Sequence, residues 1–158
     1  LLRGINVGKA KRVPMADLRA LMEGLGHANV RTLLNSGNAV FDARGGTPAA
    51  HAKALRAAIL DKLGVDCEVI VKTAAEVEAA IAEHPLRHHA DDDARLLVMF
   101  VQSPSALAEL EALAATDWSP EAFAVGAQAA WLWCEAVRQS VTQMLPCLSK
   151  VEPKAYSW

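Results

Sequence analysis

The chain has few aromatic side chains and no long hydrophobic run. Aromatic residues make up 5% of its 158 residues, and no apolar run reaches the roughly 18 residues that a membrane-spanning helix needs. No secretory signal peptide is recognisable either. We therefore expect a cytoplasmic protein without a membrane partner, whose core consists mainly of Leu, Val, Ile and Ala.

The motifs of several well-defined sites are also absent. The sequence contains no GxxxxGK(S/T) phosphate-binding loop, no GxSxG nucleophile elbow and no HExxH zinc motif. Its three cysteines, Cys67, Cys134 and Cys147, have no CxxC spacing, which favours buried free thiols in a reducing compartment. These patterns assign no catalytic residue and no cofactor, and they leave open whether the protein is an enzyme.

Four of the five histidines lie either in a polar stretch near residue 88 or at the ends of predicted helices. The stretch "RHHADDDAR" offers His88, His89 and the acidic run 91–93, which are metal-ligand types. Adjacent residues on one loop rarely converge on a metal without distant partners, so we predict a solvated loop and no metal site. We expect His27 and His51 at exposed helix ends.

The charge is distributed unevenly, although the net charge is only −2. Residues 1–44 hold seven basic and three acidic side chains, a net charge of +4, which leaves −6 for the rest of the chain. Such asymmetry marks either an anion-binding face or ordinary scatter among surface charges.

Hydrophobic periodicity and turn residues predict an α+β fold in two halves. Residues 1–73 follow a ferredoxin-like β-α-β-β-α-β order, with strands at 1–5, 29–36, 38–44 and 66–73 and helices at 14–25 and 48–63. In the second, smaller half (74–158) we expect helices at 74–86 and 103–116, a buried strand at 96–102 and a hairpin over 121–135. The stretch 138–150 also has a helical pattern, which Pro146 would break or kink. Thr47, Thr73 and Ser103 or Ser105 are the predicted helix caps. We expect the halves to pack together, as two parts or as one continuous unit.

The segment "RGINVGKAKR" at 3–12 is the first candidate site. It follows a predicted strand and leads into a helix, and helix N-termini bind anions through unpaired N–H groups. Glycine lets the backbone approach a ligand closely, and Arg and Lys supply donors for phosphate or carboxylate. The candidate ligand-binding residues are Arg3, Gly4, Asn6, Gly8, Lys9, Lys11 and Arg12. The alternative interpretation is a connecting loop with solvated lysines.

The turn "NSGN" at 35–38 is the second candidate, through Ser36 and Asn38. Asn, Ser and Gly are typical of tight turns, so a plain hairpin turn is the alternative. In the ferredoxin-like order the first strand pairs with the third. That arrangement predicts that this turn and the RGIN loop lie at opposite ends of the sheet.

Three functions are compatible with these features. The first is binding of a phosphate- or carboxylate-bearing small molecule or nucleotide at the RGINVG loop. The second is nucleic-acid binding, although RNA-recognition sheets need exposed aromatics and the strands of the first half contain only Phe41. The third is a protein-interaction module, including a homodimer formed by the apolar second half.

Trp131 and Trp133 share one strand face, and we interpret them as core residues rather than a stacking platform.

The stretches "LLRGINVGKAKRVPMADLRALMEGLG", "NVRTLLNSGNAVFDA" and "AWLWCEAVRQS" together resemble the bacterial DUF1697 family of unknown function. The resemblance is close over the first 45 residues and weaker up to residue 140. It implies an α+β protein with ferredoxin-like elements and transfers no catalytic residue. The positions that match the signature turns of the family are Arg3, Gly4, Asn6, Gly8, Ser36, Gly37 and Asn38. The tail "KVEPKAYSW" departs from the family pattern, through either truncation or divergence.

Overall fold

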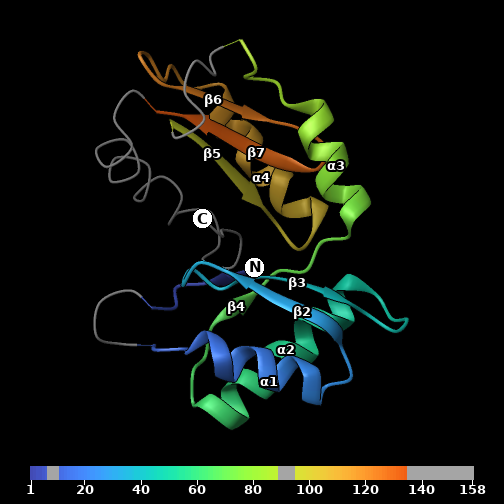
Figure 1. Cartoon of the computed structure of the whole chain (residues 1–158). Coiled ribbons are helices and arrows are strands. Elements are labelled where there is room, and N and C mark those ends of the chain that lie inside the picture. Colours follow the sequence, from blue (N-terminus) through green and yellow to red (C-terminus); the bar gives the residue numbers. More distant parts are fainter. Residues whose placement is uncertain (7–10, 89–94, 135–158) are drawn as a thin grey trace. The chain divides into compact units, whose positions relative to one another are not determined.

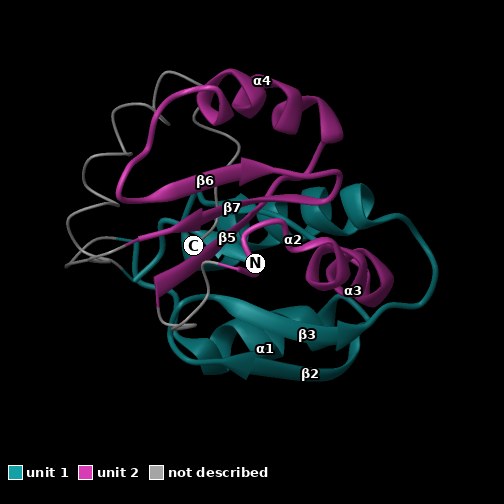
Figure 2. Ribbon diagram, turned by 90° about the horizontal axis from the view of Figure 1, so that it is seen from above, with its two compact units in different colours: residues 1–71, 157 teal, residues 72–156, 158 magenta. Residues whose placement is uncertain are grey.

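The computed structural model is an α+β protein in which residues 1–6, 11–88 and 95–134 are described (Figure 1). The chain divides into two compact units, one formed by residues 1–71 and the other starting at Lys72 (Figure 2). Within the described residues, no helix has the length and apolar character needed to cross a membrane.

Unit 1 contains the six elements that the sequence predicts, in the predicted order. They are β1 (Leu2–Arg3), α1 (Met15–Gly24), β2 (Ala28–Leu33), β3 (Asn38–Asp42), α2 (Pro48–Leu63) and β4 (Glu68–Val69). The strands pair as two separate antiparallel ladders, β1 with β4 and β2 with β3. The predicted ladder between the first and third strands is not among the described pairings. One backbone hydrogen bond lies there instead, from Leu2 N–H to the carbonyl of Gly37 at 3.1 Å.

The two helices of unit 1 bury most of the residues that their periodicity predicts. Leu18 and Met22 of α1 are buried one turn apart, as are Leu55 and Ile59 of α2. Leu25 lies seven residues after Leu18, a spacing that predicts the same helix face, but it is 43% exposed. Because α1 ends at Gly24, the side chain of Leu25 no longer follows the helical stripe.

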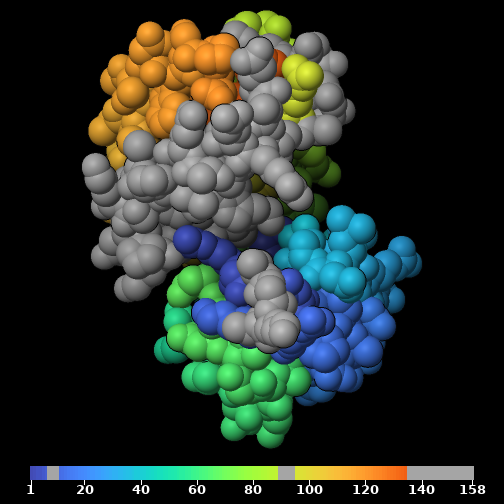
Figure 3. Space-filling model, turned by 90° about the vertical axis from the view of Figure 1, so that its left-hand side faces the viewer, coloured from blue at the N-terminus to red at the C-terminus, as the bar shows by residue number. Residues whose placement is uncertain are grey.

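Local capping explains where α2 begins and ends. The Thr47 hydroxyl accepts a hydrogen bond from Ala50 N–H at 3.2 Å, and Gly64 takes a left-handed φ of 65° at the other end. The predicted Thr47 cap is confirmed. Both helices pack on one hydrophobic core with the strands, and hairpin residues (cyan) lie beside α1 residues (blue) on the surface of unit 1 in Figure 3.

Unit 2 is a three-stranded antiparallel sheet with one helix packed on each face. Its elements are α3 (Ala74–Glu83), β5 (Leu96–Phe100), α4 (Pro104–Ala114), β6 (Ala122–Val125) and β7 (Ala129–Trp133). The strand order is β5-β7-β6, so β7 is central and four of its five residues are buried. One face packs against Leu107 and Leu110 of α4, and the other packs against Ala80 of α3.

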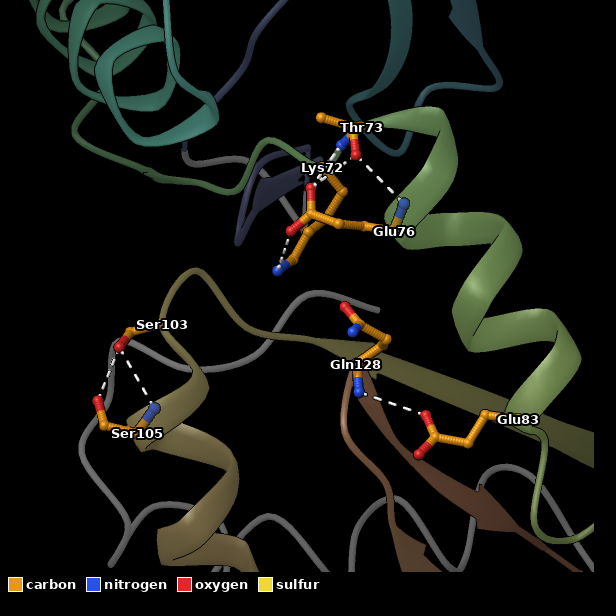
Figure 4. A network of polar contacts seen from close by, with 7 residues as sticks. All are labelled: Lys72, Thr73, Glu76, Glu83, Ser103, Ser105 and Gln128. Carbon is orange, nitrogen blue, oxygen red and sulfur yellow. Dashed lines mark hydrogen bonds and ion pairs between the residues drawn. The ribbon is translucent and has the colours of Figure 1, made fainter.

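Two helices of unit 2 begin with the predicted caps. Thr73 and Glu76 form a reciprocal capping box, in which the Thr73 hydroxyl accepts from Glu76 N–H at 3.2 Å and the Glu76 carboxylate accepts from Thr73 N–H at 2.8 Å (Figure 4). Ser103, rather than Ser105, caps α4, since its hydroxyl accepts from Ser105 N–H.

The C-terminal end of α3 contacts the turn between β6 and β7. The Glu83 carboxylate accepts a hydrogen bond from the N–H group of Ala127 at 2.5 Å. It also accepts one from the N–H group of Gln128 at 3.3 Å (Figure 4). Gly126 makes this approach possible, because a Cβ there would lie 2.5 Å from Glu83 Cδ. Nothing in the spacing of these residues predicts the contact.

Trp131, Cys67 and Cys134 lie in the core, as the sequence predicts. Trp131 is 1% exposed and its ring stacks on His84, with centroids 6.3 Å apart, so its assignment to the core is confirmed. Cys67 and Cys134 are buried, as predicted, and neither forms a disulfide with another described residue. Cys147, the helical pattern at 138–150, His89 and the acidic run 91–93 lie outside the described residues.

Candidate functional site

The RGIN segment turns sharply at the end of β1 through left-handed backbone conformations. Gly4, Asn6 and Lys11 have φ values of 69°, 56° and 50°. The Gly4 position is open, since no described atom lies within 4 Å of the place where a Cβ would stand. The glycine is therefore required by the backbone conformation rather than by lack of space.

The Asn6 side chain holds the base of this loop. Its Nδ2 donates to the carbonyl of Val13 at 3.0 Å and to the carbonyl of Asn35 at 2.8 Å. Its Oδ1 accepts from Val13 N–H at 2.9 Å, and the Asn6 backbone N–H donates to the carbonyl of Lys11 at 3.0 Å. The amide therefore pairs with both backbone polar groups of Val13, as a neighbouring strand would.

The RGIN and NSGN turns are in contact, and the prediction that they lie at opposite ends of the sheet is wrong. The hydrogen bond from Asn6 to Asn35 joins them directly. The physical reason is the length of β1, because two residues at about 3.3 Å each span only about 7 Å. The chain then reverses at Gly4, and Asn6 comes to lie beside the hairpin turn.

Next to this hydrogen bond, Gly37 of the NSGN turn packs against the side chains of Leu2 and Ile5. Its φ is 86°, and a Cβ there would lie 2.7 Å from Ile5 Cδ1 and 2.8 Å from Leu2 Cβ. Ser36 donates weakly to the Leu33 carbonyl at 3.4 Å, within the hairpin. Asn38 begins β3, opposite Leu33.

Two basic side chains of the candidate site, Lys11 and Arg12, are accessible to solvent. Both are exposed and lie just before α1, whereas Arg3 is half-buried at the end of β1. Gly8 and Lys9 lie outside the described residues. Lys11 and Arg12 therefore supply accessible positive charge next to the start of α1.

The start of α1 differs from the other described helix starts. Its N-cap residue is Pro14, and no side chain among the described residues caps the helix. In α2, α3 and α4 the side chains of Thr47, Thr73 and Ser103 accept a hydrogen bond from an N–H group of the first turn. The first turn of α1 carries Asp17, whose negative charge complements the helix dipole. The free N–H groups of this turn and the two cations before it can together hold an anion.

Cys67 lies beside this region, immediately before β4. Burial raises the pKa of its thiol, and the nearby positive charge of Lys11 opposes that shift without reversing it. A thiol with a raised pKa is protonated at neutral pH and is a poor nucleophile. The position of Cys67 therefore gives no support to thiol catalysis.

A cluster of aromatic rings elsewhere in unit 1 corrects the prediction that His27 is exposed. His27 is only 8% exposed, and its ring lies 4.4 Å from that of Phe41 and 5.1 Å from that of His51. Burial, and secondarily the charge of His51, lower the pKa of His27. The Phe41 ring lies 6.2 Å from that of His51 as well, so it packs against two histidines, which weakens its case as an RNA-stacking residue. In the described part of the chain, no three metal-ligating side chains gather into a group.

No curated protein and no solved structure matches the chain significantly. One family model, described as a protein of unknown function (DUF1697), matches residues 1–131, which include both signature turns and most of the described part of unit 2. The chain therefore belongs to the DUF1697 family.

Proposed function

We propose that the protein binds a phosphate- or carboxylate-bearing small molecule, such as a nucleotide, at the RGINVG loop. The observation that carries this proposal is the position of the exposed Lys11 and Arg12, directly before an α1 start without a side-chain cap. An anion bound there would accept hydrogen bonds from the first N–H groups of α1 and would interact with both cations.

Titration with inorganic phosphate, followed by amide NMR, tests the proposal. We expect saturable shifts at Lys11, Arg12 and the first turn of α1, with weaker binding at higher ionic strength because the charges are exposed. Nucleotides and phosphosugars are titrated next to define the rest of the ligand.

A double variant tests the role of the two cations. Lys11→Ala with Arg12→Ala removes two charge-assisted contacts, so we expect phosphate affinity to fall at least about tenfold. Lys53→Ala with Lys62→Ala removes the same charge from α2 and serves as the control. Absence of saturable binding to the unmodified protein, or an equal loss in the control, would show that the proposal is wrong.

The other predicted functions have separate tests. A salt-dependent gel shift with single-stranded RNA would favour nucleic-acid binding. Sedimentation over a range of concentrations would reveal a homodimer.

A further inference from the structure

We infer that Asn6 is a positioning residue, which holds the RGIN loop against the NSGN turn and does not itself contact the anion. This inference rests on the function proposed above and concerns how the binding loop is shaped. It also changes the role of the second signature turn, from a ligand-binding element to a support for the first.

The hydrogen bonds of Asn6 leave it little capacity for a ligand. A primary amide has two N–H donors, and both are used by the carbonyls of Val13 and Asn35. Its oxygen already accepts from Val13 N–H. An anion needs donors, and the side chain of Asn6 has none left to offer.

Asparagine is well suited to this position for two independent reasons. The φ of 56° is left-handed, and Asn tolerates this region better than most residues with a Cβ. The three side-chain bonds need two donors and one acceptor on a short side chain. Aspartate would keep the acceptor and lose both donors, and glycine would keep the backbone conformation and lose all three bonds.

The NSGN turn is held in place by Leu2 and Ile5, so the Asn35 carbonyl that binds Asn6 has a defined position. Leu2 N–H donates to the carbonyl of Gly37, and Gly37 packs directly against Leu2 and Ile5. The carbonyl of Asn35, two residues earlier, is thereby placed where Nδ2 of Asn6 reaches it at 2.8 Å. The turn therefore sets the position from which the loop departs toward Lys11.

A pair of matched variants tests the inference. Asn6→Gly retains the left-handed conformation and removes the side-chain bonds. Asn29→Gly is the control, because Asn29 also has a left-handed φ, of 53°, and one side-chain bond, to Asp42 at 2.6 Å, but lies in β2 outside the loop. We measure affinity for inorganic phosphate, hydrogen exchange at the Val13 amide and stability in urea for each variant.

We expect Asn6→Gly to weaken phosphate binding about tenfold, because the loop loses its preorganisation. Exchange at Val13 N–H should accelerate by about tenfold or more, since its acceptor is removed. Asn29→Gly should leave both readouts within about twofold, even where its stability in urea falls. Asn6→Asp keeps the bond from Val13 N–H but loses the bonds to the carbonyls of Val13 and Asn35, and it should weaken phosphate binding while the Val13 amide stays protected. This variant also serves if Asn6→Gly does not fold.

The outcomes separate this inference from the proposed function. Phosphate binding by Asn6→Gly and Asn6→Asp at the affinity of the unmodified protein would overturn the inference and leave the proposed function intact. If the unmodified protein does not bind phosphate, the proposed function fails. Unchanged Val13 exchange in Asn6→Gly would then overturn the positioning role as well, and accelerated exchange would support it.

Discussion

In each unit one polar side chain holds a glycine-containing turn, but the two contacts use different chemistry. In unit 1 the Asn6 amide donates to the Asn35 carbonyl, while in unit 2 the Glu83 carboxylate accepts from the N–H groups of Ala127 and Gln128. A turn that presents a carbonyl needs a donor, and one that presents N–H groups is suited to an anion. In both turns the side chain that binds the backbone therefore matches the polarity of the groups that the backbone presents.

The two glycines also differ in what surrounds them. A Cβ at Gly37 would meet Leu2 and Ile5, which are fixed in the core, and φ there is 86°. The three described atoms nearest to a Cβ at Gly126 all belong to the end of the Glu83 side chain, which can move away. The turn in unit 1 is therefore constrained by packing, and the turn in unit 2 depends on one hydrogen-bonding group.

Replacement of Gly37 should have the largest effect. Gly37→Ala combines an unfavourable φ with a clash in the core, so we expect a loss of about 3 kcal/mol in the free energy of unfolding, measured in urea. Gly45→Ala is the matched control, because Gly45 also has a left-handed φ, of 69°, but lies in open space among the described atoms. The control should lose about 1 kcal/mol. Equal losses would mean that the contact with Leu2 and Ile5 contributes nothing.

Removal of the Glu83 carboxylate should have a smaller effect. Glu83→Ala leaves two turn N–H groups to water, so we expect a loss of about 1 kcal/mol and faster hydrogen exchange at the Ala127 amide. Glu83→Gln keeps one acceptor oxygen and should lose less. Glu78→Ala, at an exposed position on the same helix, should leave Ala127 exchange unchanged. A similar acceleration in Glu78→Ala would contradict the assignment to Glu83.

The starts of α1 and α3 provide a further contrast. Asp17 and Glu76 occupy the same position in the two helices, but Glu76 accepts from the N–H of Thr73, and Pro14 has no N–H to offer Asp17. We expect Asp17→Asn to tighten phosphate binding about two- to threefold, by removing a competing charge. Glu76→Gln should leave phosphate affinity unchanged and lower stability. Weaker phosphate binding by Asp17→Asn would mean that the anion does not bind at this helix start.

The smallest effect should come from the titration of His27. Its pKa is lowered in the folded protein, so the unfolded chain takes up the proton first as the pH falls. The contribution of His27 is therefore present above the ordinary histidine pKa of 6.5 and is lost as the pH falls below it. We expect the free energy of unfolding to decline from pH 8 to pH 5, with a shallower slope for His27→Gln.

His51→Gln separates the two causes of that shift. It removes the neighbouring charge together with the ring contact of His51, and it leaves Phe41 packed on His27. We therefore expect it to flatten the slope less than His27→Gln, because burial is the larger cause of the shift. An unchanged slope in His27→Gln would show that the titration lies elsewhere.

Local signals in the sequence determined the elements and the place of the candidate loop. Thr47, Thr73 and Ser103 mark helix starts, and Gly64 marks a helix end, because caps and left-handed glycines act within a few residues. The basic residues after β1 and the hairpin at Gly37 were likewise visible in the order of residue types. These features depend on backbone hydrogen bonds between near neighbours, so the sequence predicts them.

Contacts between elements that are distant in the sequence depend on the tertiary structure. The Asn6 amide reaches Asn35 across 29 positions, and Glu83 reaches Ala127 across 44. The burial of His27 and the exposure of Leu25 likewise depend on how the chain turns beyond α1. Such contacts leave no period or spacing in the sequence, because they depend on the length of β1 and on the direction of each turn. For that reason two loops expected at opposite ends of a sheet came together around the side chain of Asn6.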